Sequence, residues 1–280
     1  MRRNTEETSS LSKKREQGKV TTNDFIIHWL VDSPSNNYRK FTHLELVEKD
    51  GAREDILEPL AKVIFIHHND PEEFKQNLQY LGYPEAAKEL DRRPGDENIR
   101  KGNFGEVLAS EYLKQKEGYL IPVYRLRYSQ HPDASPPGDD VLAFKLDSQK
   151  GSKKEICITE VKVRNRFGSD AVKEAYEKID KSYNGLRPRP KSLLFVIHIL
   201  RKGKKDDIAD ELLNLLDRTR GNPFNIRHII FLITGNKPRD PFNVIESIEK
   251  PVRNLTAMNL TLNDLAEFVN TVFEREVNLK

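Results

Sequence analysis

The sequence predicts a mixed α/β fold, with an N-terminal α+β region followed by a core in the order helix, three strands, helix, strand. Two observations lead to this prediction. Segments with apolar residues at helical spacing alternate with short runs rich in Val, Ile and Phe, as in a sheet covered by helices. The 280 residues are 36% hydrophobic and 32% charged. This balance fits a folded protein with a polar surface and excludes wholesale disorder.

The first 95 residues divide into a tail and a small α+β region. Residues 1–20 are charged and poor in apolar residues, so we expect a disordered tail. Within residues 21–95, we expect two strands, FIIHWLV and FTHLELVEK, and three helices, DILEPLAKVIF, PEEFKQNLQYL and PEAAKELDRR. The Pro94-Gly95 pair breaks both helix and strand, and it predicts a boundary before a second domain of residues 96–280.

The predicted second domain begins with a helix over residues 97–116. Three strands are expected next, with the sequences YLIPVYRLRY, DDVLAFKL and EICITEVKV. A helix over residues 169–183 follows, and the apolar run SLLFVIHIL predicts a buried strand after it. The remaining predicted elements are a helix at 207–218, the strand RHIIFLIT, a strand at 252–262 and a terminal helix from residue 263.

Composition points to a cytoplasmic protein with no membrane partner. The longest apolar run, residues 192–200, is far shorter than the roughly 18 residues that span a bilayer. The first twenty residues lack the apolar stretch of a secretory signal. The single cysteine, Cys157, cannot form an internal disulfide or a cysteine zinc site, so oxygen ligands are expected for any metal.

The strand EICITEVKV carries the strongest chemical signal in the chain. Alternation places Glu160 and Lys162 on the same face as Ile156 and Ile158, whereas Cys157 belongs to the opposite face. Two charges on a face that begins apolar are costly to bury unless a partner compensates them. A metal ion would compensate the carboxylate, and a phosphate would compensate the ammonium group.

The preceding strand supplies a second carboxylate. If DDVLAFKL and EICITEVKV form a hairpin, the numbers of facing residues sum to roughly 301 or 302, which places Asp140 beside Glu160 to Lys162. Asp139 points the other way, although it competes with Asp140 as a ligand. Asp140 and Glu160 offer the oxygen ligands that Mg²⁺ or Mn²⁺ prefers. Lys162 would stabilise negative charge that develops on a phosphate, so all three are candidate catalytic residues.

Positive charge collects next to these residues. The whole chain has a formal net charge of +3, but residues 162–205 contain 13 Lys or Arg and only 4 Asp or Glu. A polyanion such as DNA would fit this excess, and the few aromatic residues favour contacts to the backbone with little sequence specificity. The candidate nucleic-acid-binding residues are Arg164, Arg166, Lys173, Arg187, Arg189 and Lys191.

Residues 98–200 resemble the PD-(D/E)xK nuclease superfamily. The resemblance rests on Asp140 in PPGDDVLAF, on the Glu160-x-Lys162 pair, and on a preceding helix that carries Glu106 in FGEVLASEYL. The strings KGNFGEVLASEYL, GDDVLAF and ITEVKV are also similar to the HamA family of Hachiman antiphage systems. The resemblance implies a restriction-endonuclease-like core, metal-dependent DNA cleavage in phage defence and Glu106 as a further metal ligand. It also implies a helicase or ATPase partner of the HamB type.

Other interpretations stay open at this point. Glu160 and Lys162 can form an ordinary edge-strand ion pair, Asp139 and Asp140 can be turn residues, and Glu106 can be solvated. The chain can also be a non-catalytic nucleic-acid-binding or complex-assembly subunit that keeps a nuclease fold. A two-carboxylate hydrolase of another substrate, such as a glycoside, would not need Lys162. The preference for DNA or RNA, nicking against double-strand cleavage, the activation trigger and the oligomeric state are not predicted.

Overall fold

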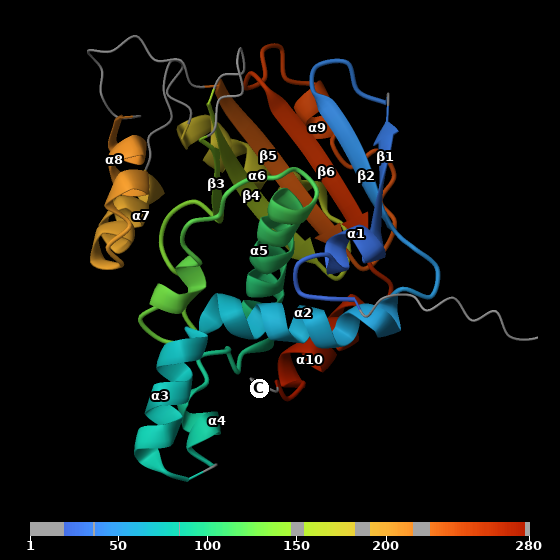
Figure 1. The fold of residues 1–280 in the computed structure, drawn as a ribbon. Coiled ribbons are helices and arrows are strands. Elements are labelled where there is room, and N and C mark those ends of the chain that lie inside the picture. The colour runs from blue at the N-terminus through green and yellow to red at the C-terminus, as the bar shows by residue number, and fades with distance from the viewer. Residues whose placement is uncertain are drawn as a thin grey trace, which may run out of the picture.

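The computed structural model describes residues 20–35, 37–83, 85–146, 154–182, 191–214 and 225–277. One six-stranded sheet, in the order β1-β2-β6-β5-β4-β3, forms its centre, with helices on both faces (Figure 1). The strands are β1 (Leu30–Ser35), β2 (Thr42–Glu48), β3 (Val141–Lys145), β4 (Glu155–Arg164), β5 (Asn225–Thr234) and β6 (Leu255–Thr261). The predicted mixed α/β class is confirmed.

The sheet is mixed, because its centre is parallel and both of its ends are antiparallel. Strands β2, β6, β5 and β4 run parallel to one another, whereas β1 pairs antiparallel with β2 and β3 pairs antiparallel with β4. The N-terminal region is joined to the rest of the sheet, since Thr42 of β2 pairs with Thr256 of β6. Residues 21–95 and residues 96–280 therefore share one sheet.

Four helices cover one face of the sheet (Figure 1), namely α1 (Phe25–Trp29), α2 (Arg53–His68), α5 (Glu97–Gln115) and α10 (Leu265–Glu274). Their apolar side chains pack against inward-facing residues of the strands, such as Phe231 of β5. This is the largest buried apolar cluster of the described residues. Burial of apolar area on this scale is the main term that stabilises such a fold.

Two further apolar clusters cover the other face. Helices α6 (Ser169–Ser182) and α9 (Asn243–Glu246) pack on Ile230 and Leu232 of β5. Helices α7 (Lys191–Lys202) and α8 (Asp206–Asn214) pack on Phe144 of β3 and Ile156 of β4. The remaining elements are α3 (Pro71–Leu81), α4 (Ala86–Leu90) and a short 3₁₀ turn, η1 (Arg125–Tyr128).

Helix α5 lies unusually close to β4, and a glycine makes this possible. A Cβ atom on Gly105 would lie 2.5 Å from Val163 Cγ2 and 2.7 Å from Val161 Cγ1, distances that carbon atoms do not tolerate. Asp96 begins the helix by accepting hydrogen bonds from the backbone N–H groups of Asn98 and Ile99. The close approach at Gly105 holds the next residue, Glu106, against the strand.

The predicted hairpin of β3 and β4 is confirmed, with a register that differs slightly from the expected one. Val141 faces Thr159 and Leu142 faces Ile158, so facing residue numbers sum to 300. The predicted faces of β4 are also confirmed. Cys157 packs in the cluster under α5, whereas Ile156 and Ile158 pack under α7 and α8.

Two strand predictions near the site are wrong. Residues 119–128 do not form a strand, because Pro122 lacks the N–H that a strand ladder needs and η1 follows. Leu120 alone bridges to Phe144 of β3. Residues 192–200 form helix α7, because the buried residues Leu193, Val196 and Leu200 follow helical spacing. The strand that follows α6 in the described chain is β5 instead.

The first predicted strand, FIIHWLV, is wrong in its first half. Residues 25–29 form helix α1, which follows a turn in which the Asp24 carboxylate accepts hydrogen bonds from Thr21. The strand begins at Leu30. The predicted tail, apart from Val20, and residues 147–153 of the hairpin loop lie outside the described residues. Within the described part of the chain, no helix combines the length and apolar character that crossing a membrane requires.

Candidate functional site

Three of the predicted catalytic or metal-binding residues meet at a pocket of about 610 Å³, a volume typical of ligand-binding sites. The start of α5, the loop before β3 and the end of β4 form its walls. Glu106, Asp140 and Lys162 line this pocket. Cations and amides of α5, of the end of β4 and of α6 also line it, namely Asn98, Lys101, Arg164, Asn165 and Lys178.

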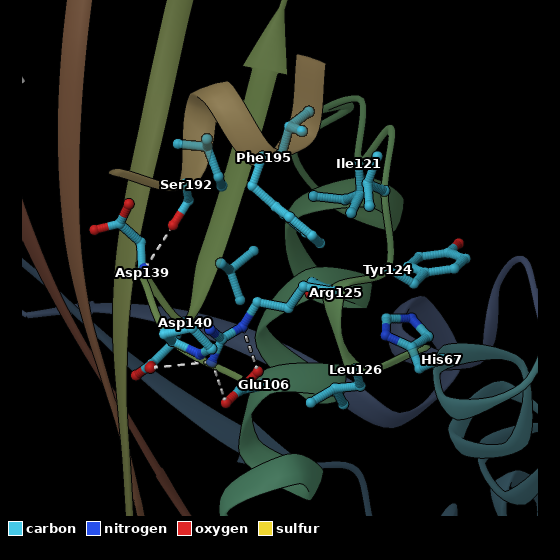
Figure 2. Close-up of a pocket in the computed structure, with 16 residues that line it drawn as sticks. His67, Glu106, Ile121, Tyr124, Arg125, Leu126, Asp139, Asp140, Ser192 and Phe195 are labelled. Atoms are coloured by element: carbon cyan, nitrogen blue, oxygen red, sulfur yellow. Dashed lines mark hydrogen bonds and ion pairs between the residues drawn. The ribbon is translucent and has the colours of Figure 1, made fainter. Parts of the chain in front are cut away.

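Asp140 is anchored to β4 by its own carboxylate. Its Oδ2 accepts a hydrogen bond of 2.8 Å from the backbone N–H of Val161. Because β3 begins one residue later and Val141 faces Thr159, the hairpin register places Asp140 beside Glu160. The backbone N–H of Asp139 donates to Ser192 Oγ on α7, and Figure 2 shows the Asp139 carboxylate turned away from Glu106. The structure therefore presents Asp140 to the pocket side.

Glu160 and Lys162 project from the same face of β4 toward α6. Lys162 Nζ lies 3.5 Å from Glu160 Oε1 and 3.5 Å from Glu174 Oε2 of α6. Lys178, one turn further along α6, donates a 2.5 Å hydrogen bond to Glu160 Oε1. The Glu160 and Lys162 side chains are only 6% and 11% exposed, so they are not a solvated edge-strand pair.

Glu106 is buried, and it pairs with Arg125 of η1. Arg125 Nε and Nη2 donate to the two carboxylate oxygens of Glu106 at 3.0 and 2.8 Å, a two-pronged ion pair (Figure 2). Arg125 Nη2 also lies 3.6 Å from Asp140 Oδ1. The alternative of a solvated Glu106 is therefore wrong, since only 8% of the residue is exposed.

The carboxyl groups of the site raise one another's pKa. Burial raises the pKa of Glu106 to about 7, Arg125 opposes this shift, and Asp140 and Glu160 add to it. Burial also raises the pKa of Glu160 to about 7, with Asp140 acting in the same direction and Lys178 and Lys162 against it. Acidic groups that raise each other's pKa in a pocket are typical of functional sites, because a bound cation can relieve their repulsion.

The donor set fits a divalent cation such as Mg²⁺ or Mn²⁺. Asp140 and Glu160 are neighbouring hard oxygen donors, and Mg²⁺ often takes only one or two protein carboxylates, with water and phosphate oxygens completing its shell. Among the described residues, no three His, Cys, Asp or Glu side chains are grouped as a metal site. The third expected ligand, Glu106, is engaged by Arg125 in this conformation.

The predicted nucleic-acid-binding residues are only partly placed at the pocket. Arg164 lines it and lies 3.6 Å from Glu174. Arg166 and Lys173 are exposed, beyond the end of β4 and on α6. Lys191 begins α7, but its side chain lies outside the described residues, as do Arg187 and Arg189.

Sequence reasoning missed two residues that contact the carboxylates directly. Arg125 was expected on a strand, where nothing in the spacing connects it with Glu106, 19 residues earlier. Lys178 belongs to the basic segment, but its contact with Glu160 depends on how α6 packs against β4. A signal existed for Lys178, since it lies one helical turn after Glu174, on the same face of α6.

Comparison with known proteins agrees with the residue-level resemblance. The family model of HamA matches residues 21–275, a range that includes every described element from α1 to α10. The chain is 28% identical over 260 residues to the Hachiman protein HamA of Bacillus cereus, and the alignment covers 90% of each chain. The chain therefore belongs to the HamA family.

Proposed function

We propose that the protein is a divalent-metal-dependent deoxyribonuclease with little sequence specificity, the effector of a Hachiman antiphage system. The observation that carries the proposal is the placement of Asp140 beside Glu160, with Lys162 on the same strand and in the same pocket. Two carboxylates and a lysine at one pocket suit phosphodiester hydrolysis. The family membership and the similarity to a Hachiman protein support the defence role.

Each residue has a separate role in the proposed reaction. Asp140 and Glu160 would hold the cation, with Glu106 as a further ligand if Arg125 releases it. The bound cation supplies charge stabilisation at the phosphate and lowers the pKa of a water molecule. The Lys162 ammonium group stabilises negative charge on the phosphate or orients the attacking water. Arg164 at the end of β4 and Lys101 on α5, which both line the pocket, would contact neighbouring backbone phosphates.

A nuclease with little sequence specificity would also attack the DNA of its own cell. We therefore propose control by a helicase or ATPase partner of the HamB type. Expression of the wild-type chain alone should be toxic, and Glu160→Gln should remove the toxicity. Co-expression of the partner should suppress the toxicity of the wild type. If the partner leaves toxicity unchanged, this part of the proposal is wrong.

A second function is favoured by a specific observation. The carboxylates that would hold a cation already contact cations of the chain, Arg125 at Glu106 and Lys178 at Glu160. A non-catalytic DNA-binding subunit would keep such pairs permanently. This subunit would bind DNA without a divalent metal and would never shorten it.

The experiment incubates purified protein with plasmid DNA in Mg²⁺, Mn²⁺ or EDTA, with and without the partner. The test variants are Glu160→Gln and Lys162→Met. The matched control combines Glu72→Gln with Lys75→Met, which removes an exposed ion pair of 3.8 Å on α3. Metal-dependent cleavage that only the test variants lose supports the nuclease. Binding without cleavage under every condition, including with the partner, supports the second function and overturns the first.

A further inference from the structure

The Arg125 guanidinium links three segments of the site. Two of its nitrogens donate to Glu106 of α5 at 3.0 and 2.8 Å, and Nη1 donates to the carbonyl oxygen of Pro136 at 2.9 Å. The side chain is 13% exposed. Three hydrogen bonds therefore hold the guanidinium at the wall of the pocket, and Figure 2 shows it between Glu106 and Asp140.

Arg125 lies farther from Asp140 than from Glu106, and it makes no hydrogen bond to Asp140. Its Nη2 lies 3.6 Å from Asp140 Oδ1, which is too long for a hydrogen bond but within the range of an ion pair. The other oxygen of Asp140, Oδ2, is already bonded to the backbone of Val161. Oδ1 is thus the oxygen that a bound cation would use, and the guanidinium charge lies next to it.

These charges leave one cation shared between two carboxylates. The Asp140 side chain is 14% exposed and the Glu106 side chain is 11% exposed, so water screens their repulsion poorly. The single positive charge of Arg125 partly offsets both. A divalent cation at Asp140 would itself offset the negative charge of this carboxylate. The positive guanidinium would repel that cation. Arg125 and the cation therefore compete for the same negative charge.

We propose that Arg125 serves as the resident counter-ion of the metal-free site and that Glu106 is the residue that positions it. Held by Glu106, Arg125 partly offsets the charge of Asp140 and opposes the binding of a divalent cation at Asp140 Oδ1. Glu106 then acts mainly through Arg125, by holding the guanidinium at a distance from Asp140. This inference rests on the proposed function, because it concerns the same metal site.

The test measures Mn²⁺ affinity by calorimetry on the full chain, without DNA. The variants are Glu106→Gln, Arg125→Lys, the double variant Glu106→Gln/Arg125→Gln, and Glu160→Gln. The double variant is used because Arg125→Gln alone leaves a buried carboxylate without its partner, which is strongly destabilising. Thermal melting confirms that each variant is folded.

Glu106→Gln should weaken Mn²⁺ binding about threefold or more, because Arg125 loses its two-pronged partner and moves toward Asp140. Adding Arg125→Gln should then tighten binding about tenfold relative to Glu106→Gln alone. Arg125→Lys, which keeps the charge, should stay within about threefold of the wild type.

Two results would overturn the inference. If Glu106 is a direct metal ligand only, Glu106→Gln weakens binding and the second substitution does not restore it. If the pair is merely structural, Glu106→Gln and the double variant both bind Mn²⁺ as tightly as the wild type does. The proposed function is tested separately, by Mn²⁺ binding to Glu160→Gln and by the DNA cleavage assay. Loss of binding in Glu160→Gln confirms the metal site whichever way the Arg125 comparison falls.

Discussion

The backbone N–H of Val161 donates to Asp140 Oδ2 at 2.8 Å, and this bond joins the start of β3 to the centre of β4. The same strand carries Glu160 and Lys162, whose side chains project toward α6, on the face opposite the Val161 side chain. The Asp140 carboxylate is therefore positioned by the β3–β4 hairpin as well as by the loop that precedes it. Rigid strands are suited to hold ligands at fixed distances, which a metal site requires.

Because α5 packs closely on β4, alanine should change the free energy of unfolding differently at two glycines of this helix. Gly105→Ala should destabilise the fold by about 1–3 kcal/mol, because the new methyl group overlaps Val161 and Val163. Gly102→Ala meets no atom within 4 Å, and it should be neutral or stabilise by up to about 1 kcal/mol. Urea unfolding of both variants measures the difference. Equal free energies of unfolding would show that α5 does not pack on β4 in this way.

The cationic side chains that line the pocket are the ones expected to contact DNA. Lys101→Gln and Arg164→Gln should each weaken binding about threefold or more at moderate salt, and each should reduce the salt dependence by about one phosphate contact. The control is Lys116→Gln, which follows α5 at its far end and contacts Asp32 at 3.5 Å. Fluorescence anisotropy with the metal-free protein measures all three. An equal loss for Lys116→Gln would mean that DNA binding is not centred on the pocket.

The buried carboxyl of Glu106 predicts a pH-dependent stability in EDTA. Its pKa is raised to about 7 in the folded chain, from an ordinary value near 4.5. The folded chain therefore holds a proton that the unfolded chain releases between pH 4.5 and 7. This contribution to stability is fully present below pH 4.5 and is lost as the pH rises through about 7.

Buried histidines act in the opposite direction, because burial lowers the pKa of His67 and His68. The measurement is therefore a comparison between wild type and the double variant Glu106→Gln/Arg125→Gln. From pH 5 to pH 8, the double variant should gain stability relative to the wild type, on the order of 1–3 kcal/mol. Parallel melting-temperature profiles of the two proteins would contradict the assignment.

The hairpin and the faces of β4 were predictable because strand alternation has a period of two and the loop length limits the register. The expected pairing differed from the observed one by only one or two residues. Residues 192–200 were not predictable in the same way, since a short apolar run is compatible with a buried strand or a helix. The two consecutive exposed residues Leu194 and Phe195, between buried Leu193 and Val196, distinguish a helix from a strand only once the structure is known.

The carboxylates of the site were predictable, but the cations that hold them were not. Asp140 and Glu160 follow from strand phase, a local property of the sequence. Arg125 reaches Glu106 because η1 packs beside α2, where Arg127 donates to the carbonyl oxygen of Ile66. Such contacts between distant segments depend on tertiary packing and leave no periodic signal in the sequence.

Two adjacent residues offer the most direct test of the central claim, that Asp140 and Glu160 form the metal site of a nuclease. Asp139 and Asp140 differ in the structure because Asp140 is bonded to β4, whereas the Asp139 carboxylate is turned away. The measurement is the rate of plasmid cleavage in Mn²⁺ by Asp139→Asn and Asp140→Asn. Asp140→Asn should reduce the rate at least about a hundredfold, and Asp139→Asn should stay close to the wild type. Full activity of Asp140→Asn, or loss confined to Asp139→Asn, would contradict the account.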